Sequence, residues 1–236
     1  MSEKADFTIK ANTGKELTIT VDGREYARIP VKTHVITEKD NLADIFTKYL
    51  KPHAKQGDIL FISEKAVACT QARAVPMKDI RPRPLARFLC KFVHKTPHGI
   101  GLGIPETMEM ALRECGIPRI LFAAFASVVG KILGRRGWFY IVAGEKARSI
   151  DGPTPYTIPP YNGCVVLGPK NPTEAAKTCA KAAGHPVAVV DINDLGGNIL
   201  GVSNPDMDVN LLVQILADNP LGQGEEQTPC GIIRGV

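Results

Sequence analysis

The chain has 236 residues, of which 44% are hydrophobic and 22% charged, the balance of a globular protein with a sizeable core. Its net charge of +5 is modest, and its six cysteines form no Cys-x-x-Cys pair, which argues against a zinc or redox motif. The polar start lacks the apolar stretch of a signal peptide, and the most apolar run, residues 120–130, is shorter than the roughly 20 residues that span a bilayer. We expect one cytoplasmic domain over residues 1–236, with its cysteines as small core residues.

The N-terminal third predicts a hairpin, a helix and a buried strand. Residues 17–21 alternate apolar and polar side chains before an Asp22-Gly23 turn, which indicates a β-hairpin and makes residues 1–27 an N-terminal extension. Thr37 is a candidate cap for an amphipathic helix over residues 38–50. The apolar run Ile59–Ile62, after a Gly-Asp turn, predicts a buried strand.

The middle of the chain predicts a helical subregion, residues 81–134. Three helices are expected there, separated by the Gly/Pro-rich residues 97–105 and 116–118. Residues 138–143 are aromatic and β-branched, so we expect a return to β structure.

The C-terminal third predicts a β-α-β unit. Asn171 precedes a proline and an acid in the first turn of a predicted helix that ends at Gly184. With strands at 164–167 and 187–190 on either side, this helix suits a parallel crossover. Another helix is expected from Asn204 to about residue 217. The predicted fold class is therefore α/β, of the mixed α+β kind, with a β-α-β core, an N-terminal hairpin and a helical middle region.

Two segments have more than one interpretation. Five basic residues fall within residues 81–95, which suits a solvated basic helix face, a platform for a phosphorylated small molecule, or nucleic-acid binding without a recognition motif. Three glycines within residues 98–103 precede a proline that begins a helix, so this stretch suits an anion cradle or a hinge. We expect no nucleic-acid partner and no membrane association.

Two aspartates stand at predicted strand ends. Asp191 follows four apolar residues at the carboxyl end of a strand, where open α/β sheets place ligands, and Asp151 precedes a Gly-Pro turn. Carboxylates in such places suit Mg²⁺, which one or two acids and substrate phosphates hold, or they serve as turn aspartates that cap local amides.

The closing residues, 222–236, form a Gly-rich acidic loop, a proline and a short apolar strand that ends in Arg-Gly. Gly222 and Gly224 allow close approach of the backbone to a ligand, although a simple turn before a strand has the same pattern. This tail resembles the end of the gamma-glutamyl ligases of the deazaflavin coenzyme F-420. Three further blocks, residues 57–73, 167–172 and 187–193, are similar to that family's motifs and fall in the same order.

The resemblance implies a ligase that phosphorylates a substrate carboxylate with GTP or another nucleotide before an amine attacks the acyl phosphate. It assigns a divalent ion, Mg²⁺ or Mn²⁺, to Asp151 and Asp191, and the clamping of an anionic acceptor to Lys65 or Arg73. It assigns nucleotide binding to a third group of residues: Ser63, Asn193, Gly222 and Gly224. The implied partners are an anionic small molecule and a nucleotide, and the implied assembly is a homodimer.

The chain departs from the family pattern at several positions. Ala68, Cys69 and Gln71 replace Ser, Lys and Glu, and Ile192 replaces a threonine associated with metal and nucleotide. The segment after Asp194 is shorter and lacks the family's arginines. These departures predict little or no glutamate addition to the deazaflavin, and they leave open a non-catalytic binding module that holds an anionic metabolite.

Overall fold

The computed structural model describes residues 9–93, 101–135, 137–194, 196–222, 224 and 226–236. The chain divides into two compact units: unit 1 contains residues 1–72 and 169–236, and unit 2 contains residues 73–168. Each unit combines helices with strands, so the mixed α/β fold class is confirmed. The predicted hairpin extension lies in unit 1, and the predicted helical subregion lies in unit 2.

Unit 1 is built on a six-stranded sheet. Its strands, in spatial order, are β1 (Thr18–Val21), β2 (Arg24–Val31), β8 (Cys230–Gly235), β3 (Ile59–Ser63), β6 (Val187–Asn193) and β7 (Gly196–Val202). Only β3 and β6 run parallel within this sheet. The β1–β2 hairpin is confirmed, with Asp22 and Gly23 both at positive φ as a tight primed turn requires.

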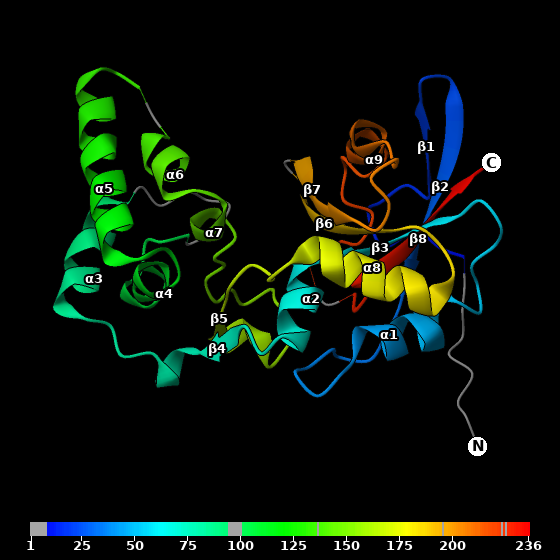
Figure 1. Ribbon diagram of the computed structural model, residues 1–236, viewed down its shortest axis with the longest axis horizontal. Helices are drawn as coiled ribbons and strands as arrows, with labels where there is room; N and C mark the ends of the chain where they lie inside the picture. The colour runs from blue at the N-terminus through cyan, green and yellow to red at the C-terminus, as the bar shows by residue number, and fades with distance from the viewer. Residues whose placement is uncertain (1–8, 94–100, 136, 195, 223, 225) are drawn as a thin grey trace. The chain divides into compact units, whose positions relative to one another are not determined.

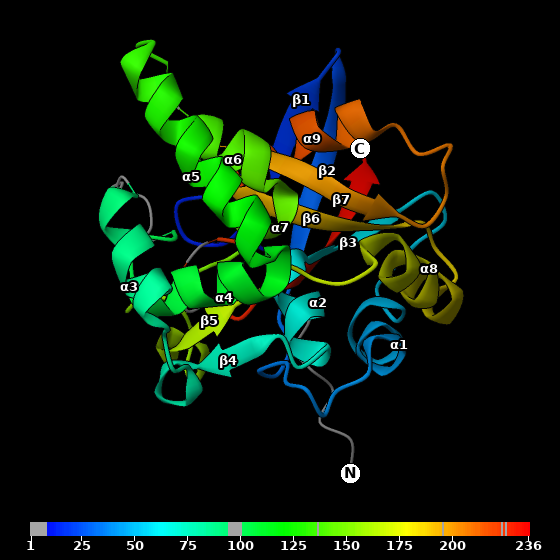
Figure 2. The same cartoon turned by 60° about the vertical axis from the view of Figure 1, so that its left-hand side comes forward.

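Helices cover the two faces of this sheet (Figures 1 and 2). One face packs against α9 (Val209–Ile215) through an apolar cluster that includes Phe61, Ala188, Val190 and Leu212. The other face lies under α1 (Leu42–Ile45), α2 (Glu64–Thr70) and α8 (Pro172–Ala183). Side chains alternate along β6, so its two faces serve two different layers.

The helix predicted at residues 38–50 is shorter and begins later. Thr37 donates to the carboxylate of Asp40 in a turn, and Asn41 caps α1 instead. The second half, Phe46–Leu50, is a π-helix. The prediction erred because the side chain of Thr37 takes part in a local turn, which competes with helix capping for short polar side chains.

The predicted β-α-β unit is wrong in its pairing. β5 (Cys164–Val166) pairs with β4 (Ala74–Pro76) in a separate two-stranded sheet of unit 2, whereas the parallel partner of β6 is β3. Helix α8 does start at the proline and end at Gly184, but Asn171 has a left-handed backbone and its side chain does not cap the helix. The helix expected from Asn204 starts only at Val209, after the cap Asp208.

Unit 2 contains the three helices expected in the middle of the chain. They are α3 (Pro84–Leu89), α4 (Pro105–Cys115) and α5 (Ile117–Ile132), followed by α6 (Trp138–Ala143) and α7 (Glu145–Arg148). Short 3-10 turns complete the unit at Met77–Asp79, Cys90–Phe92 and Tyr161–Gly163. The core gathers around α4, which buries Met108, Ala111 and Leu112.

The β structure expected at residues 138–143 is wrong, because these residues form α6. Gly137 and Gly144 bracket the helix at φ of 86° and 85°. The ring of Trp138 packs beside Gly130 of α5, where a Cβ would come within 3.0 Å of it. Packing against a neighbouring helix therefore outweighs the strand propensity of these residues, because strand propensity depends strongly on context.

Five of the six cysteines are buried, as expected for core residues. Within the described residues, no single helix is long and apolar enough to cross a membrane; α4 and α5, bent by 118°, meet the length and composition test only as a pair.

Candidate functional site

Three segments meet at one edge of the unit 1 sheet. Because β3 and β6 are parallel, their carboxyl ends reach the same edge, with Ser63 opposite Val190. β8 is antiparallel to β3 and therefore starts at this edge, where the N–H of Ser63 donates to the carbonyl of Pro229 at 2.8 Å. Ser63, Asp191 and the segment that precedes β8 are thus brought to the edge where open sheets place ligands.

The sequence suggested that Asp191 follows its strand. In the structure, Asp191 lies within β6, opposite Asn198 of β7. Ile192 packs with Val190 in the apolar cluster under α9. Alternation along the strand therefore places the side chains of Asp191 and Asn193 on the opposite face, the one that carries α2 and α8. Asp191 is partly buried and Asn193 is exposed.

Lys65 is exposed in the first turn of α2, next to the strand end that carries Ser63. The hydroxyl of Ser63 accepts from the N–H of Ala66 at 3.4 Å and so caps the helix. The departures at Ala68 and Cys69 fall on the buried side of α2, with 1% and 7% exposure. These positions serve packing here, and Lys65 remains the candidate cation of the helix.

The closing loop, residues 222–229, is anchored at its base. Besides the contact of Pro229 with Ser63, the carbonyl of Gln227 accepts from the N–H of Thr33 at 3.1 Å. The amide of Asn12 donates to the hydroxyl of Thr228 at 2.9 Å. These contacts hold the base of the loop beside the start of α2, and the role of the loop in binding a ligand stays a prediction.

The tip of the closing loop folds around Glu226, one of the acids of the Gly-rich acidic loop. The carboxylate of Glu226 accepts from the N–H of Gly224 at 2.7 Å. A Cβ at Gly222 would lie 2.7 Å from that carboxylate, and Gly222 has φ of 77°, so glycine suits the position for two reasons. The spacing of two glycines and a following acid was the available signal. Glu225 lies outside the described residues.

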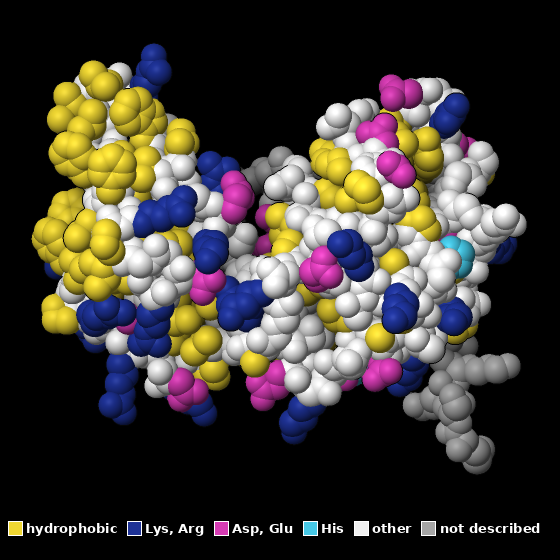
Figure 3. Space-filling view, viewed as in Figure 1, with side chains coloured by type: hydrophobic (Ala, Val, Ile, Leu, Met, Phe, Trp, Pro, Cys, Tyr) yellow, Lys and Arg dark blue, Asp and Glu magenta, His cyan; other side chains and the backbone are white. Residues whose placement is uncertain are grey.

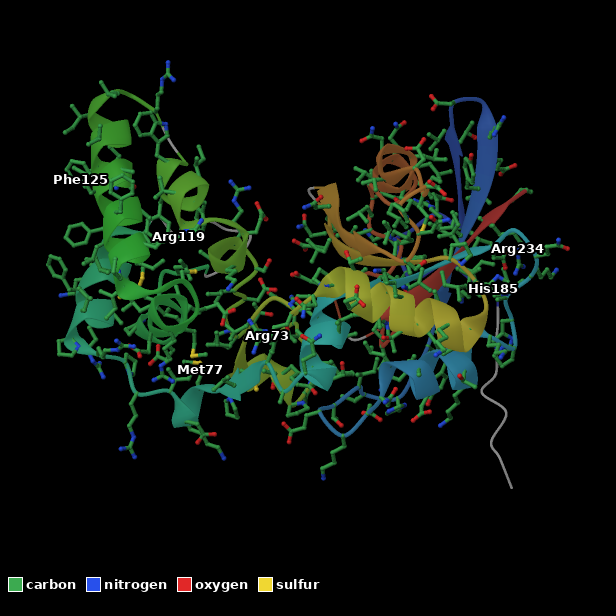
Figure 4. All side chains as sticks on the ribbon, viewed as in Figure 1. Arg73, Met77, Arg119, Phe125, His185 and Arg234 are labelled. Atoms are coloured by element: carbon green, nitrogen blue, oxygen red, sulfur yellow. The ribbon has the colours of Figure 1, made fainter. Side chains whose placement is uncertain are left out.

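Arg73 has partners within unit 2. Its side chain donates to the carbonyl of Gly168 and, at 2.8 Å, to the carboxylate of Glu114, and the residue is 7% exposed. These contacts give Arg73, labelled in Figure 4, a structural role. Its expected role as an anion clamp stays a prediction.

Asp151 also belongs to unit 2, where its backbone forms an isolated bridge with Val166 through two hydrogen bonds of 2.9 Å. It is partly buried. The expected strand or turn boundary at Asp151 is therefore present.

The basic segment at residues 81–95 is partly neutralised. Glu109 of α4 is 1% exposed and accepts from the backbone and side chain of Arg83 and, at 2.8 Å, from Arg113. Burial opposes the charge of Glu109, but these hydrogen bonds outweigh it and lower its pKa. Lys95, and the residues 98–100 of the expected anion cradle, lie outside the described residues.

The Arg-Gly ending has a structural function. Arg234 donates twice to Asp58, at 2.9 and 2.6 Å, and once to the carbonyl of His53 at 3.0 Å. Asp58 belongs to the Gly-Asp turn before β3, so two blocks far apart in sequence meet in one bidentate ion pair. Figure 4 shows Arg234 and His185 at this end of unit 1.

A comparison with protein families matches residues 30–200 to the model described as F420-0:Gamma-glutamyl ligase. The chain belongs to this family. No curated protein matches the chain. The matched region contains Ser63, Lys65, Arg73, Asp151 and Asp191 and ends before the closing loop.

Within this family fold, two more motif blocks are joined directly. The side chain of Gln71 donates to the carbonyl of Lys170 at 2.9 Å and accepts from its N–H at 2.6 Å. The carbonyl of Arg73 accepts from the N–H of Leu167 at 3.0 Å. Gln71 thus links the segment after α2 to the start of α8.

The donor set of the candidate site suits a hard divalent ion. Within the described part of the chain, no three His, Cys, Asp or Glu side chains gather in a metal-binding group. Mg²⁺ needs no such group when one or two carboxylates and substrate phosphates bind it. The carboxylate of Asp191 and the amide oxygen of Asn193, on one face of β6, are oxygen donors of the right kind.

Proposed function

We propose that this chain is a nucleotide- and divalent-metal-dependent amide ligase that acts on a carboxylate of an anionic, phosphorylated small molecule. The family match over residues 30–200 carries the proposal. The gathering of Ser63, Asp191 and the closing loop at one sheet edge supports it. The nucleotide is proposed to be GTP, with Mg²⁺ or Mn²⁺ as the ion.

The proposed reaction has two steps. A carboxylate oxygen of the substrate attacks the terminal phosphorus of the nucleotide, the bond to the bridging oxygen breaks, and the nucleoside diphosphate leaves. An amine then attacks the acyl carbon, a C–N bond forms, phosphate leaves, and the amine proton passes to solvent. Lys65, exposed at the start of α2, would hold an anionic group of the acceptor.

Asp191, together with Asn193 on the same face of β6, would hold the ion, which supplies positive charge beside the phosphates. A metal-binding role of Asp151, which belongs to unit 2, stays a prediction, and substitution of Asp151 tests it separately. Ser63, Gly222 and Gly224 are proposed to contact the nucleotide. Ser63 lies opposite Val190 at the sheet edge, and the loop that carries the two glycines joins this edge at Pro229.

The second candidate, a binding module without turnover, is favoured by Ile192. Its side chain packs in the apolar cluster with Val190, so it offers no oxygen ligand on either face. Such a module would hold an anionic metabolite at the same edge without transferring a phosphoryl group.

A thermal-shift experiment with the full chain tests whether nucleotide and ion bind together, as the ligase requires. GTP and Mn²⁺ together should raise the melting temperature, whereas either alone should have little effect, because the ion and the phosphates bind as one unit. Asp191→Asn should abolish the joint effect. Asp206→Asn is the matched control and should keep the joint stabilisation. Asp206 lies in an exposed turn that follows β7, at the end of this strand away from Asp191.

Turnover separates the two candidates. A ligase should release nucleoside diphosphate and phosphate only when both a carboxylate acceptor and an amine are present. Joint binding without release supports a module that holds nucleotide and ion, and the absence of any joint stabilisation contradicts the ligase. We also propose a homodimer, and sedimentation of a monomer at micromolar concentration would remove that part.

A further inference from the structure

Helix α5 exposes an apolar face that its own unit does not cover. Phe122, Phe125, Val128 and Ile132 are 63%, 64%, 53% and 79% exposed. Figure 4 shows Phe125 projecting from α5 on the side away from α6. A monomeric globular protein seldom exposes so many large apolar side chains together, so this face indicates a binding surface.

The opposite side of α5 already supplies the contacts with the core. Ile120, Ala123 and Gly130 are buried, and Trp138 of α6 packs beside Gly130. At 100° per residue, the exposed apolar side chains fall within one stripe of about 140°, with Lys131 at its border. Within α5 this stripe contains no charged residue. Helix α5 therefore contacts the core of its unit through the side opposite to the exposed face.

The neighbouring helix α3 and its 3-10 extension continue the pattern. Phe88 and Phe92 are 57% and 56% exposed, with ring centroids 5.1 Å apart. Two exposed basic residues stand directly before these rings in the chain, Arg87 before Phe88 and Lys91 before Phe92. Figure 3 shows hydrophobic side chains gathered over α5 and α3, with Lys and Arg side chains at their border. Aromatic rings beside basic groups are typical of segments that lie in a membrane interface.

The charge of the chain is divided unevenly. Residues 73–168, which form unit 2, contain fourteen Lys and Arg against six Asp and Glu, a formal excess of eight positive charges. The whole chain carries only +5, so the remainder is net negative by three. A strong charge asymmetry of this kind points to an anionic partner surface.

We propose that this apolar face, formed by the exposed side chains of α5, Phe88 and Phe92, binds the surface of an anionic lipid bilayer. The aromatic and aliphatic side chains would enter the interface, while Arg87, Lys91 and Lys131 contact lipid phosphates. The charge excess disfavours a second copy as the occupant, because two such faces would bring like charges together. The expectation of no membrane association rested on the length of the apolar run, whereas surface binding depends on exposed side chains.

Vesicle sedimentation with the full chain tests the proposal. The chain should sediment with vesicles of phosphatidylcholine and phosphatidylglycerol at low salt, bind vesicles of phosphatidylcholine alone much more weakly, and dissociate as salt rises. Phe125→Glu should weaken binding at least about ten-fold, and Lys91→Ala about five-fold.

Two matched controls locate the surface. Val209→Glu places the same acid at a partly exposed apolar position of α9 in unit 1, and Lys181→Ala removes an exposed lysine from α8. Both should bind as the wild type does. The emission of Trp138, the only tryptophan, reports that α5 and α6 remain packed in each variant. If Phe125→Glu disturbs this packing, Phe125→Ser provides the same comparison.

Three outcomes overturn the proposal. The first is no binding to anionic vesicles, and the second is binding that Phe125→Glu leaves unchanged. The third is a dimer in sedimentation velocity that Phe125→Glu dissociates while vesicles are not bound, which would make the face an interface between two copies. None of these outcomes bears on the proposed ligase site, which is tested by nucleotide and metal.

Discussion

The ion pair of Asp58 and Arg234 predicts a large loss of stability when only one partner is removed. The side chain of Asp58 is 1% exposed and that of Arg234 is 18% exposed. Removal of one member of a buried pair costs about 3 to 5 kcal/mol, because the remaining charge is left without compensation. We expect Arg234→Ala to lower the free energy of unfolding by about 3 kcal/mol, the lower end, since solvent reaches part of Arg234.

Urea denaturation followed by circular dichroism measures this cost. Arg24→Ala, at an exposed position near the β1–β2 turn, is the control and should change the unfolding free energy by less than about 0.5 kcal/mol. The double variant Asp58→Asn with Arg234→Ala should be destabilised by less than the sum of the single variants, because each single change already breaks the pair.

The pair should also make stability depend on pH. Burial opposes the charge of Asp58, but hydrogen bonds from Arg234 and from the N–H of Lys55 outweigh it and hold the pKa below the ordinary 3.8. A group with a lowered pKa in the folded state stabilises the fold above its unfolded pKa. This contribution should be lost as the pH falls below 3.8 through the folded-state pKa. A cost of Arg234→Ala under about 1 kcal/mol at neutral pH, or one that stays constant into strong acid, would refute the argument.

Three further predictions follow from single contacts. Gly231→Ala should destabilise the central strand β8 by about 1 to 3 kcal/mol, since its Cβ would lie 2.4 Å from the Phe ring of β3, whereas Gly235→Ala, with no atom within 4 Å, should be nearly neutral in the same urea titration. Gly222→Ala should lower the melting temperature more than Gly14→Ala. Both glycines have positive φ, but only a Cβ at Gly222 would meet the carboxylate of Glu226. Ile192→Thr should not restore glutamate addition to the deazaflavin with GTP and Mn²⁺, since the new hydroxyl would enter the apolar cluster; a restored rate of product formation would contradict this placement.

The parts of the fold that the sequence predicted are those with local signals. The β1–β2 hairpin follows from two residues that adopt positive φ, and α8 follows from a proline at its start and Gly184 at its end. The three helices of unit 2 are separated by glycine and proline. Each of these signals acts within a few residues, so the pattern alone determines the structure there.

The parts that the sequence did not predict depend on distant partners. Trp138–Ala143 is helical because of packing on α5, and β5 joins β4 instead of β6. Asp58 and Arg234 are 176 residues apart in the chain, and neither has a local pattern that indicates the other. The contact between Glu226 and Gly224 is local, but a turn motif with an acid is too common to assign.

The contacts between the motif blocks distinguish motif residues that support the fold from positions that could bind a ligand. Asp58 binds Arg234, and Arg73 binds the backbone of Gly168, so these motif residues hold the fold together. A sequence can keep such contacts while its ligand-binding positions change, because the two sets respond to different constraints. Ile192, at a position that the family associates with metal and nucleotide, is such a change. Membership of the family therefore says more about the scaffold of this chain than about its acceptor substrate. Turnover assays must accordingly compare different acceptor substrates.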